Sequence, residues 1–477
     1  MRMLPMLPML RRPGSLLAIS FALLAPLVAR PAHAQAGKFD LVKTKTVLTG
    51  LIEQSMKDGG VPSVSIALVR GDSIVWKAAF GYANVRMKTP ATTETYYSTG
   101  STFKSATATG IMQLVEQGKL KLDQPVNNYL ENVRVQDRLQ SEKQVTIRHI
   151  LSHWSGLTAG AVTKPIWGRE LPKTLEQMVG TLYSVRPPET KYEYNNFAYG
   201  LAGLLVQQVS GVEYEKYMVE HVLKPVGVMT PHPFRPTPEM VELMALPYLP
   251  GGSNGSPKPV EQVHFDVYPA GDIWLRPEEM ARFLGAHLNG GAFQGKRIAS
   301  EASIKATHEA QFGGTYAFGW DVKKDASGHT IIDHTGGIPG MSSYMLGDVD
   351  AKVGVYFMSN SGAPTSIGEA ALKLLRGEEY VPPAPRKVVA VDAATLDRYA
   401  GVYEVNSDVA ITLAREGANL TFRVNDQPAN ALVAESPTSF YSKGAPWTLS
   451  FAPNAAGVVD QFTLGTDDQK QVAKKKK

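Results

Sequence analysis

A serine and a lysine three positions apart could form the core of a nucleophilic site. Ser101 and Lys104 stand at the start of a long helical pattern, so their side chains share one helix face. A serine attacks poorly until a base removes its proton, and a lysine can be that base when burial or nearby charge lowers its pKa. The free N–H groups of a helix N-terminus could also stabilise an oxyanion. Taken alone, the tetrad also fits a helix-capping serine beside a solvated lysine.

Two later segments could complete such a site. The run Tyr194 to Asn196 precedes a predicted helix and could aim a phenol at the serine and an amide at a substrate carbonyl. The run His334 to Gly337 ends a predicted strand, and its glycines allow a main-chain N–H to approach closely as a second oxyanion donor. The chain has no cysteine, which excludes a thiolate nucleophile, disulfides and Cys-ligated zinc. The nucleophile must therefore be a hydroxyl.

The elements that would position these residues run from strands through helices and back to strands. A hairpin is predicted from Ser63 to Phe80, and the helix of the nucleophile from about Ser101 to Gln117. Other helices are predicted at Phe39–Lys57, Ile147–Ser152, Leu175–Tyr183, Tyr199–Ser210 and Pro277–Leu288. Later strands are predicted at Tyr316–Val322, Thr330–His334, Met341–Leu346 and Val353–Ser359. This order predicts an α+β or mixed α/β domain whose sheet is closed by non-local strands, and not a βαβ repeat.

Prolines and then short strands follow this large domain. Residues 378–396 form a Pro-rich and therefore stiff linker. Residues 397–469 alternate apolar and polar positions between turn residues, which predicts a small antiparallel β domain. Residues 470–477 end in the run Lys474 to Lys477, which has no apolar side chain to bury, and we expect this tail to be disordered. The catalytic domain is expected to span residues 35–377.

The first 34 residues are typical of a secretory signal peptide. Four arginines flank an apolar run from Leu16 to Val28, and Ala32-His33-Ala34 provides a small-x-small cleavage site. A membrane anchor is the alternative, but the run is shorter than the roughly 20 residues that a span needs. We therefore expect cleavage after Ala34 and a secreted or periplasmic protein with no integral membrane segment.

Composition and charge agree with a globular protein. Hydrophobic residues make up 43% and charged residues 19% of the 477, which excludes wholesale disorder and fibrous repeats. The formal charge of +5 comes from the arginines of the leader and the lysines of the tail. The charge therefore does not point to nucleic acid or to an anionic membrane as a partner.

Together, these segments resemble the serine β-lactamase and penicillin-binding-protein superfamily, in its class C-like, esterase-like branch. The Ser-x-x-Lys tetrad, the Tyr-x-Asn run and the His-Thr-Gly strand stand in the family's order. Supporting runs are Thr146 to Leu157, Pro269 to Asp272 and Gly336 to Gly340. The likeness covers about residues 40–375 and implies an antiparallel sheet flanked by helices, plus an all-helical part. The C-terminal domain resembles small lipocalin-like β domains.

The resemblance implies a role for each site residue. Ser101 would form an acyl-enzyme, Lys104 would activate it, and Tyr194 would relay protons to the leaving group and then activate water. The backbone N–H groups of Ser101 and Gly337 would form the oxyanion hole. The expected substrate-binding residues are Asn196, His334, Thr335, Gly336 and Gly337. The resemblance requires no metal and no organic cofactor.

One departure from the family pattern bears on the substrate. The usual lysine of Lys-Thr-Gly, which holds a substrate carboxylate, is His334 here, and a histidine is mostly neutral near pH 7. The sequence therefore favours hydrolysis of carboxylic esters, or of amides and peptides, with weak β-lactam hydrolysis at most. The alternatives are a class C-type β-lactamase, a D,D-peptidase or D-amino peptidase acting on cell-wall peptides, and a non-hydrolytic penicillin or peptidoglycan sensor.

Two histidines, three tryptophans and one long loop could each serve either the packing of the domain or the active site. His149 and His153 have the i, i+4 spacing of a metal pair, but no glutamate follows in the zinc-protease pattern. The family likeness explains them as packing and support of the active site. Trp154, Trp167 and Trp274 either line the acyl pocket or pack in the core. The long loop from about Thr230 to Asp266 could shape the cleft.

Overall fold

The computed structural model describes most of the chain after the expected leader. The described residues are 38–159, 163–165, 174–249, 256–362, 365–382, 386–406, 409–425, 429–442, 448–454, 458–465 and 470–476. The predicted signal peptide, residues 1–34, and Trp167 lie outside them. None of the helices within these ranges has the length and apolar character that a membrane span requires.

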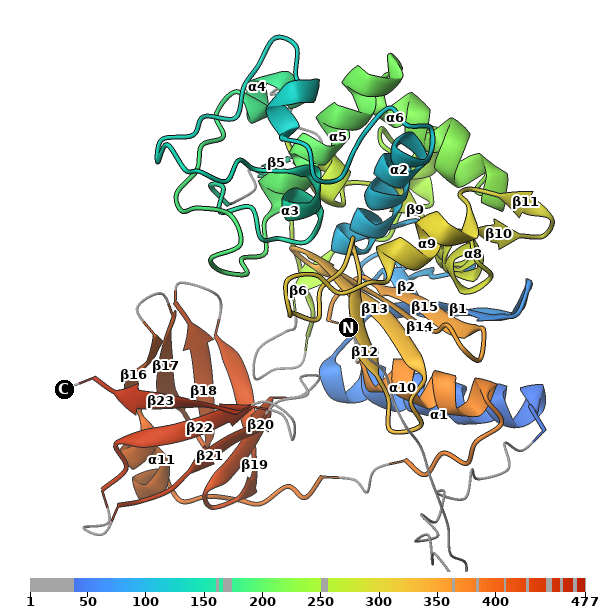
Figure 1. Ribbon diagram of the computed structural model, residues 1–477. Coiled ribbons are helices and arrows are strands. Elements are labelled where there is room, and N and C mark those ends of the chain that lie inside the picture. The colour runs from blue at the N-terminus through green and yellow to red at the C-terminus, as the bar shows by residue number, and fades with distance from the viewer. Residues whose placement is uncertain are drawn as a thin grey trace, which may run out of the picture. The chain divides into compact units, whose positions relative to one another are not determined.

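A seven-stranded antiparallel sheet forms the centre of the catalytic domain (Figure 1). Its strand order is β12-β13-β14-β15-β1-β2-β3. The strands are β1 (Ser63–Arg70), β2 (Ser73–Asn84), β3 (Thr89–Pro90), β12 (Asp321–Lys324), β13 (Thr330–Ile338), β14 (Met341–Asp348) and β15 (Val353–Ser359). The predicted β1–β2 hairpin is confirmed, and β1 pairs with β15 from Val64↔Ser359 to Arg70↔Val353. The expectation that distant strands close the sheet is therefore confirmed.

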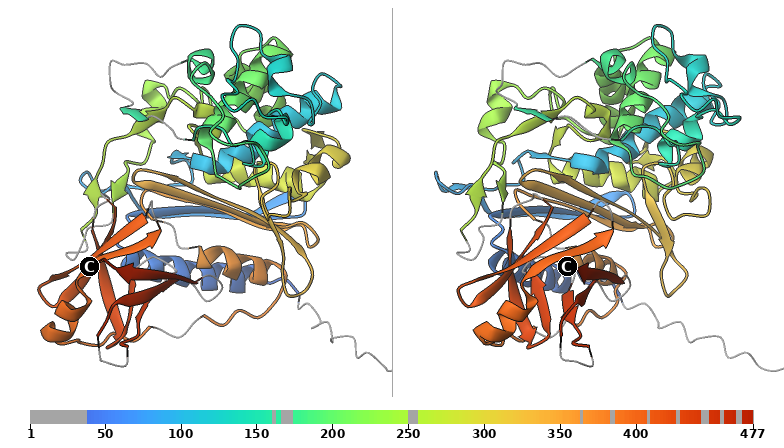
Figure 2. Two further views of the ribbon diagram at one scale, coloured as in Figure 1. Left: turned by 60° about the vertical axis from the view of Figure 1, so that its left-hand side comes forward. Right: turned by 90° about the vertical axis from the view of Figure 1, so that its left-hand side faces the viewer.

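Helices cover both faces of this sheet (Figure 2). Helices α1 (Leu41–Gly59) and α10 (Ser366–Leu375) pack on one face, where they bury Ile66 and Leu68 of β1. Helix α8 (Pro277–Leu288) packs on the other face, where Ala67 and Val69 of β1 join the larger core. Successive side chains of a strand point to opposite faces, and β1 is covered on both, so it is buried along nearly its whole length. The sheet is thus the central layer between two hydrophobic cores.

A helical part lies beyond α8, and its central helix carries the nucleophile segment. The 3₁₀ turn η1 (Gly100–Phe103) continues into α2 (Lys104–Glu116), which is buried from Lys104 to Leu114. A helix buried on all sides lies inside a core rather than on its surface. Around it lie α3 (Ile147–Leu151), α4 (Leu175–Val179), α5 (Asn196–Ser210), α6 (Tyr214–Tyr217), η3 (Met218–Leu223) and α9 (Glu301–Thr307).

The predicted strand at Tyr316–Val322 is wrong in its position. Tyr316 makes only an isolated bridge to Asp321, and strand β12 begins at Asp321. Gly319 adopts a φ of 78° in a tight turn in which the N–H of Ala317 donates to the carbonyl of Trp320. A left-handed residue interrupts an extended strand, so the apolar run folds back on itself. Tyr316 therefore belongs to this turn and not to a strand of the sheet.

The C-terminal segment is a closed eight-stranded antiparallel barrel preceded by helix α11 (Ala393–Tyr399). Its strands are β16 (Gly401–Asn406), β17 (Val409–Glu416), β18 (Asn419–Val424), β19 (Asn430–Ser436), β20 (Ser439–Ser442), β21 (Thr448–Phe451), β22 (Gln461–Gly465) and β23 (Lys470–Lys475). The interior is filled by side chains, including the stacked rings of Tyr399 and Phe451 at 3.9 Å. The predicted small antiparallel β domain is confirmed.

The expected disordered tail is wrong for residues 470–475. These residues form β23, which pairs with β22 along its length and with β16 at Lys474 and Lys475. Ala473 is fully buried among the interior side chains. Barrel closure supplies partners for the backbone N–H and C=O groups, and this does not require an apolar sequence. The lysine-rich end of the chain therefore forms a strand that its composition does not predict.

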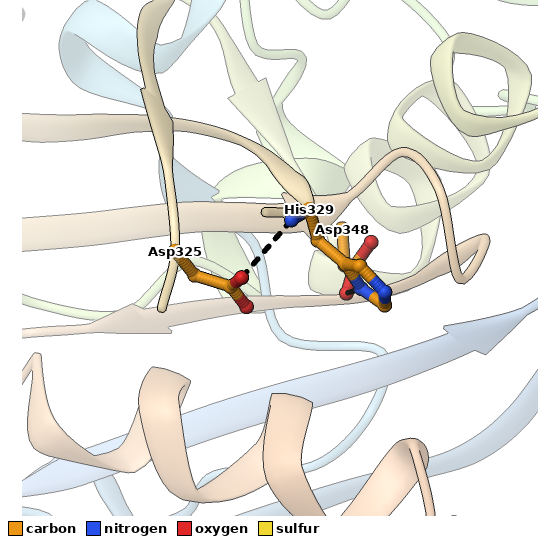
Figure 3. Close-up of side chains that lie close together, drawn as sticks. All are labelled: Asp325, His329 and Asp348. Carbon is orange, nitrogen blue, oxygen red and sulfur yellow. Dashed lines mark hydrogen bonds and ion pairs between the residues drawn. The ribbon is translucent and has the colours of Figure 1, made fainter. Parts of the chain in front are cut away.

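A network of charged side chains ties the β12–β13 turn to the ends of β14 and α10. Asp325, His329 and Asp348 lie close together (Figure 3), with their potential ligand atoms within 4.8 Å, a spacing that could hold a metal ion. Arg376 donates through Nη1 to Asp325 at 2.8 Å and to Asp348 at 2.9 Å. His329 Nδ1 lies 2.7 Å from Asp348 Oδ2, and this contact raises the pKa of His329. The Arg376 guanidinium and the His329 ring already pair with these carboxylates, so we interpret the cluster as an ion-pair network.

We expect Arg376→Met to lower the free energy of unfolding of the catalytic domain by about 3 kcal/mol, because Asp348 is fully buried and would lose its guanidinium partner. Urea unfolding followed by tryptophan fluorescence would measure this. Arg235→Met is the matched control, since Arg235 pairs with Glu215 at the surface and its loss should cost less than about 1 kcal/mol. Equal losses in the two variants would contradict the structural role of the network.

Candidate active site

The turn from η1 into α2 brings the serine and the lysine together. Lys104 Nζ lies 3.1 Å from Ser101 Oγ, 2.7 Å from Asn196 Oδ1 and 2.9 Å from the carbonyl oxygen of Ala270. The lysine side chain is fully buried, and burial holds its pKa well below the usual range. A neutral amine has two N–H donors and one lone pair. The donors match the two carbonyl-type oxygens of Asn196 and Ala270, and the lone pair remains for the hydroxyl proton of Ser101.

Tyr194 lies against this pair just before helix α5. Its ring centroid is 4.8 Å from Lys104 Nζ, and its hydroxyl makes a hydrogen bond with Ser101. Burial, opposed by that hydrogen bond, raises the pKa of Tyr194. Burial thus favours the uncharged form of both groups, the protonated phenol and the neutral amine. Of the two groups, the lysine is suited to be the base and the tyrosine to be a proton donor.

The N-terminus of α5 fixes the tyrosine and the asparagine on either side of a capping residue. The Asn195 side chain caps the helix by accepting from the N–H of Ala198 at 3.0 Å. Its amide also donates to the carbonyls of Leu157 and Thr158. Asn caps satisfy the free N–H groups at a helix start, which explains why the helix begins here. Tyr194 and Asn196 are thus held by one rigid helix end.

Two glycines, Gly271 and Gly336, allow their backbone segments to approach closely the turn that carries Ser101. A Cβ at Gly336 of β13 would lie 2.3 Å from the carbonyl oxygen of Thr99, and a Cβ at Gly271 would lie 2.2 Å from that of Gly100. Any other residue at either position would force these segments apart. A Cβ at Gly100 would in turn lie 2.7 Å from the backbone nitrogen of Gly337. The N–H of Gly337 therefore lies next to the turn that carries Ser101, as an oxyanion hole requires.

A small pocket opens above the nucleophile. It is lined by Gly100, Ser101, Asn196, Phe265, Val267, Ala270, Gly271, Gly337 and Ile338. None of these lining residues carries a charge, and four of them, Phe265, Val267, Ala270 and Ile338, present apolar side chains. The predicted long loop ends at this pocket, because Phe265 of β8 (Val263–Phe265) belongs to its lining. The pocket can therefore accept a small apolar acyl group beside Ser101.

His334 lies behind Tyr194, and both of its ring nitrogens are already hydrogen-bonded. Nδ1 donates to the carbonyl of Thr335 at 2.6 Å, and Nε2 accepts from the hydroxyl of Tyr316 at 2.9 Å. Burial lowers the pKa of His334 to about 3, so the ring is neutral near pH 7. His334 offers neither a charge nor a free nitrogen to a substrate carboxylate.

The structure brings together four of the predicted site residues, namely Ser101, Lys104, Tyr194 and Asn196. Gly336 and Gly337 adjoin them, whereas Thr335 is exposed on β13. Reasoning from the sequence missed the carbonyl of Ala270 and the hydroxyl of Tyr316. The run Pro269 to Asp272 carries a family likeness but no chemical signal of its own, and no local pattern marks Tyr316. Trp274 is fully buried in the core, and Trp154 packs half-buried against Phe312 and Tyr192.

Comparison with known proteins agrees with this geometry. The Beta-lactamase family model matches residues 48–377. Penicillin-binding protein 4* of Bacillus subtilis (strain 168) is 27% identical over 439 residues, which cover 85% of this chain and 91% of the relative.

Two solved structures share the fold. The octameric penicillin-binding protein homologue from Pyrococcus abyssi superposes with a TM-score of 0.60 and 23% identity, over 90% of this chain and all of its own. The D-amino acid amidase from Ochrobactrum anthropi SV3 superposes with a TM-score of 0.54 and 24% identity, over 70% of this chain and 95% of its own.

The family model spans more than half of the chain, and the sheet, the helical part and the serine–lysine pair all lie within it. The chain therefore belongs to the beta-lactamase family, a family of serine hydrolases with the β-lactamase-like fold.

Proposed function

We propose that this protein is an exported serine hydrolase that forms an acyl-enzyme at Ser101 and hydrolyses carboxylic esters, or amides and peptides. The observation that carries the proposal is the contact set of Lys104, whose amine is buried and faces the hydroxyl of Ser101 at 3.1 Å. A serine needs a base within hydrogen-bond distance, and a buried neutral lysine meets that need at neutral pH. Export rests on the predicted leader, and the reaction as written uses no cofactor.

In the proposed first half-reaction, Ser101 Oγ attacks the substrate carbonyl carbon while Lys104 takes the hydroxyl proton. The resulting oxyanion accepts from the N–H groups of Ser101 and Gly337. The proton then passes from Lys104 through Tyr194 to the leaving oxygen or nitrogen, and the bond to the leaving group breaks. Asn196 holds the lysine amine in place and faces the same pocket as the acyl group.

In the second half-reaction, water attacks the acyl-enzyme carbonyl. The water proton passes through Tyr194 and Lys104 back to Ser101 Oγ as the ester bond breaks. The carboxylic acid leaves and the free enzyme is restored. Tyr194 keeps its own proton between steps, in agreement with the raised pKa of its phenol.

The substrate preference follows from the absence of a charged partner among the described residues that line the pocket. The ring of His334 is neutral and its nitrogens are occupied, so a substrate carboxylate would find no cation there. Burying a carboxylate without a partner is costly, so uncharged acyl groups are favoured. The D-amino acid amidase among the structural neighbours supports amides as the second candidate. Cell-wall peptides, β-lactams and a sensor role remain alternative proposals.

We expect the enzyme to hydrolyse p-nitrophenyl butyrate with a kcat/KM at least about tenfold above that for p-nitrophenyl hemisuccinate. The two esters share a leaving group, and only the hemisuccinate adds a charged terminus, whose unpaired burial costs on the order of 1–3 kcal/mol. Nitrocefin, assayed in parallel, should be turned over weakly. Efficient hydrolysis of nitrocefin without ester turnover would refute the proposed substrate class.

We expect Ser101→Ala to abolish labelling by a fluorophosphonate probe, and Lys104→Arg to slow it by at least about 100-fold, because a guanidinium cannot take the serine proton. In the wild type, the labelling rate should fall as the pH drops through the lowered pKa of Lys104, since protonation removes the base. Labelling at pH 7 should remain efficient. Lys143→Arg, at an exposed lysine paired with Glu189, is the control and should label normally.

A deacylation time course with fluorescent penicillin distinguishes the remaining classes. Rapid release of the label is expected of a hydrolase, because Tyr194 and Lys104 can deliver water to the acyl-enzyme. A persistent adduct would favour a sensor or a transpeptidase. Failure of the wild type to react with either probe would refute the assignment of Ser101.

A further inference from the structure

His153 adopts a backbone conformation that is unfavourable for a histidine. Its φ is 65°, in the left-handed region, and its side chain is completely buried. A non-glycine residue in this region costs on the order of 1–2 kcal/mol. Such a residue persists only when its contacts compensate for the strain. The contacts that His153 makes in this conformation therefore indicate its role.

The residues on either side of Tyr194, Glu193 and Asn195, both donate their backbone N–H groups to His153. The N–H of Glu193 donates to the backbone carbonyl of His153 at 2.9 Å. The N–H of Asn195 donates to the ring nitrogen Nδ1 of His153 at 3.0 Å. The left-handed turn lets one residue present a carbonyl and a ring nitrogen to the same short segment. The backbone of Tyr194 is thereby fixed on both sides.

The imidazole also packs directly against the tyrosine ring. The ring centroids of His153 and Tyr194 are 4.3 Å apart, and Tyr316 and Tyr199 lie at 4.6 and 5.3 Å from the same imidazole. Because Nδ1 accepts a hydrogen bond, the ring proton must be on Nε2. Burial lowers the pKa of His153 well below its usual value, which preserves Nδ1 as an acceptor. Neither nitrogen of His153 contacts Ser101 or lines the pocket.

We propose that His153 is the positioning residue of Tyr194, which holds the phenol at the distance and angle needed for proton transfer to the leaving group. The proposal rests on the proposed function, in which Tyr194 carries that proton. A misplacement of about 1 Å can cost on the order of 100-fold in rate, so a residue that touches no substrate can control the step. Loss of His153 should therefore slow the reaction most for substrates whose leaving group must be protonated.

The test compares two esters with the same acyl group. Ethyl butyrate releases an alkoxide that must be protonated, whereas p-nitrophenyl butyrate releases a stable phenolate that needs no proton. His153→Gly keeps the left-handed backbone and the carbonyl contact to Glu193 but removes Nδ1 and the ring. We expect its kcat to fall about 10- to 100-fold for ethyl butyrate and less than about threefold for p-nitrophenyl butyrate, with KM little changed.

Two further variants separate positioning from a general loss of structure. His153→Asn places Oδ1 where Nδ1 stands and tolerates the left-handed backbone, so it should recover much of the lost kcat. His149→Ala is the matched control, because it removes another buried histidine ring, on α3, which contacts Thr146 and Glu189 instead of Tyr194. It should reduce the turnover of both esters equally or not at all.

A double-mutant cycle with Tyr194→Phe is decisive. Once the phenol is absent, His153→Gly should cause less than about a twofold further loss on ethyl butyrate. Three results would overturn the inference. The first is that His153→Gly lowers kcat equally with and without the Tyr194 phenol. The second is that it lowers kcat equally for both esters, and the third is that it leaves kcat unchanged. If Tyr194→Phe itself shows no dependence on the leaving group while Ser101 still labels, the proton-relay role of Tyr194 fails and the inference fails with it. If Ser101 does not label, the proposed function is at fault.

Discussion

Burial of the Lys104 amine is the constraint on which the rest of the site depends. An ammonium group in water would be a poor base, and one taken out of water loses its hydration. The fold resolves this by surrounding the nitrogen with two oxygen acceptors and one hydroxyl, a set that a neutral amine satisfies completely. The acceptors come from α5 and from the segment before β9 (Trp274–Leu275), so three distant parts of the chain must meet at one nitrogen.

Close backbone approach is the second requirement, and it follows from the first. The segment that supplies the Ala270 carbonyl can reach Lys104 only because Gly271 lies directly against Gly100. Strand β13 can bring the Gly337 N–H beside the same turn only because Gly336 has no side chain. The proposed base and the proposed oxyanion hole are therefore built by the same packing, with glycines on both sides of the Ser101 turn. Catalytic geometry here is a property of backbone packing as much as of side chains.

An aromatic layer lies behind the lysine and makes its surroundings weakly polar. In the usual family pattern, a lysine on β13 would place a cation near the substrate. Here His334 is bound to Tyr316 and to its own strand, and the adjacent His153 supports Tyr194. The neutral histidines, the tyrosines and the uncharged pocket form one continuous environment of low polarity. Such an environment keeps the pKa of Lys104 low, and under the proposed function it also disfavours a charged substrate, so the proposal links base strength to substrate preference.

Sequence patterns alone determined the local parts of this protein. The i, i+3 spacing of Ser101 and Lys104, the β1–β2 hairpin and the alternating strands of the C-terminal domain are all short-range patterns, and the structure contains each of them. Only the tertiary structure decided that Asn196 and Ala270 complete the lysine's contacts, that Tyr316 comes from a turn, and that a lysine-rich tail closes a barrel. The physical reason is that these features depend on partners far away in the chain. The left-handed turn of His153 belongs with them, because the contacts that compensate for its strain come from residues far along the chain, such as Asn195 and Tyr316.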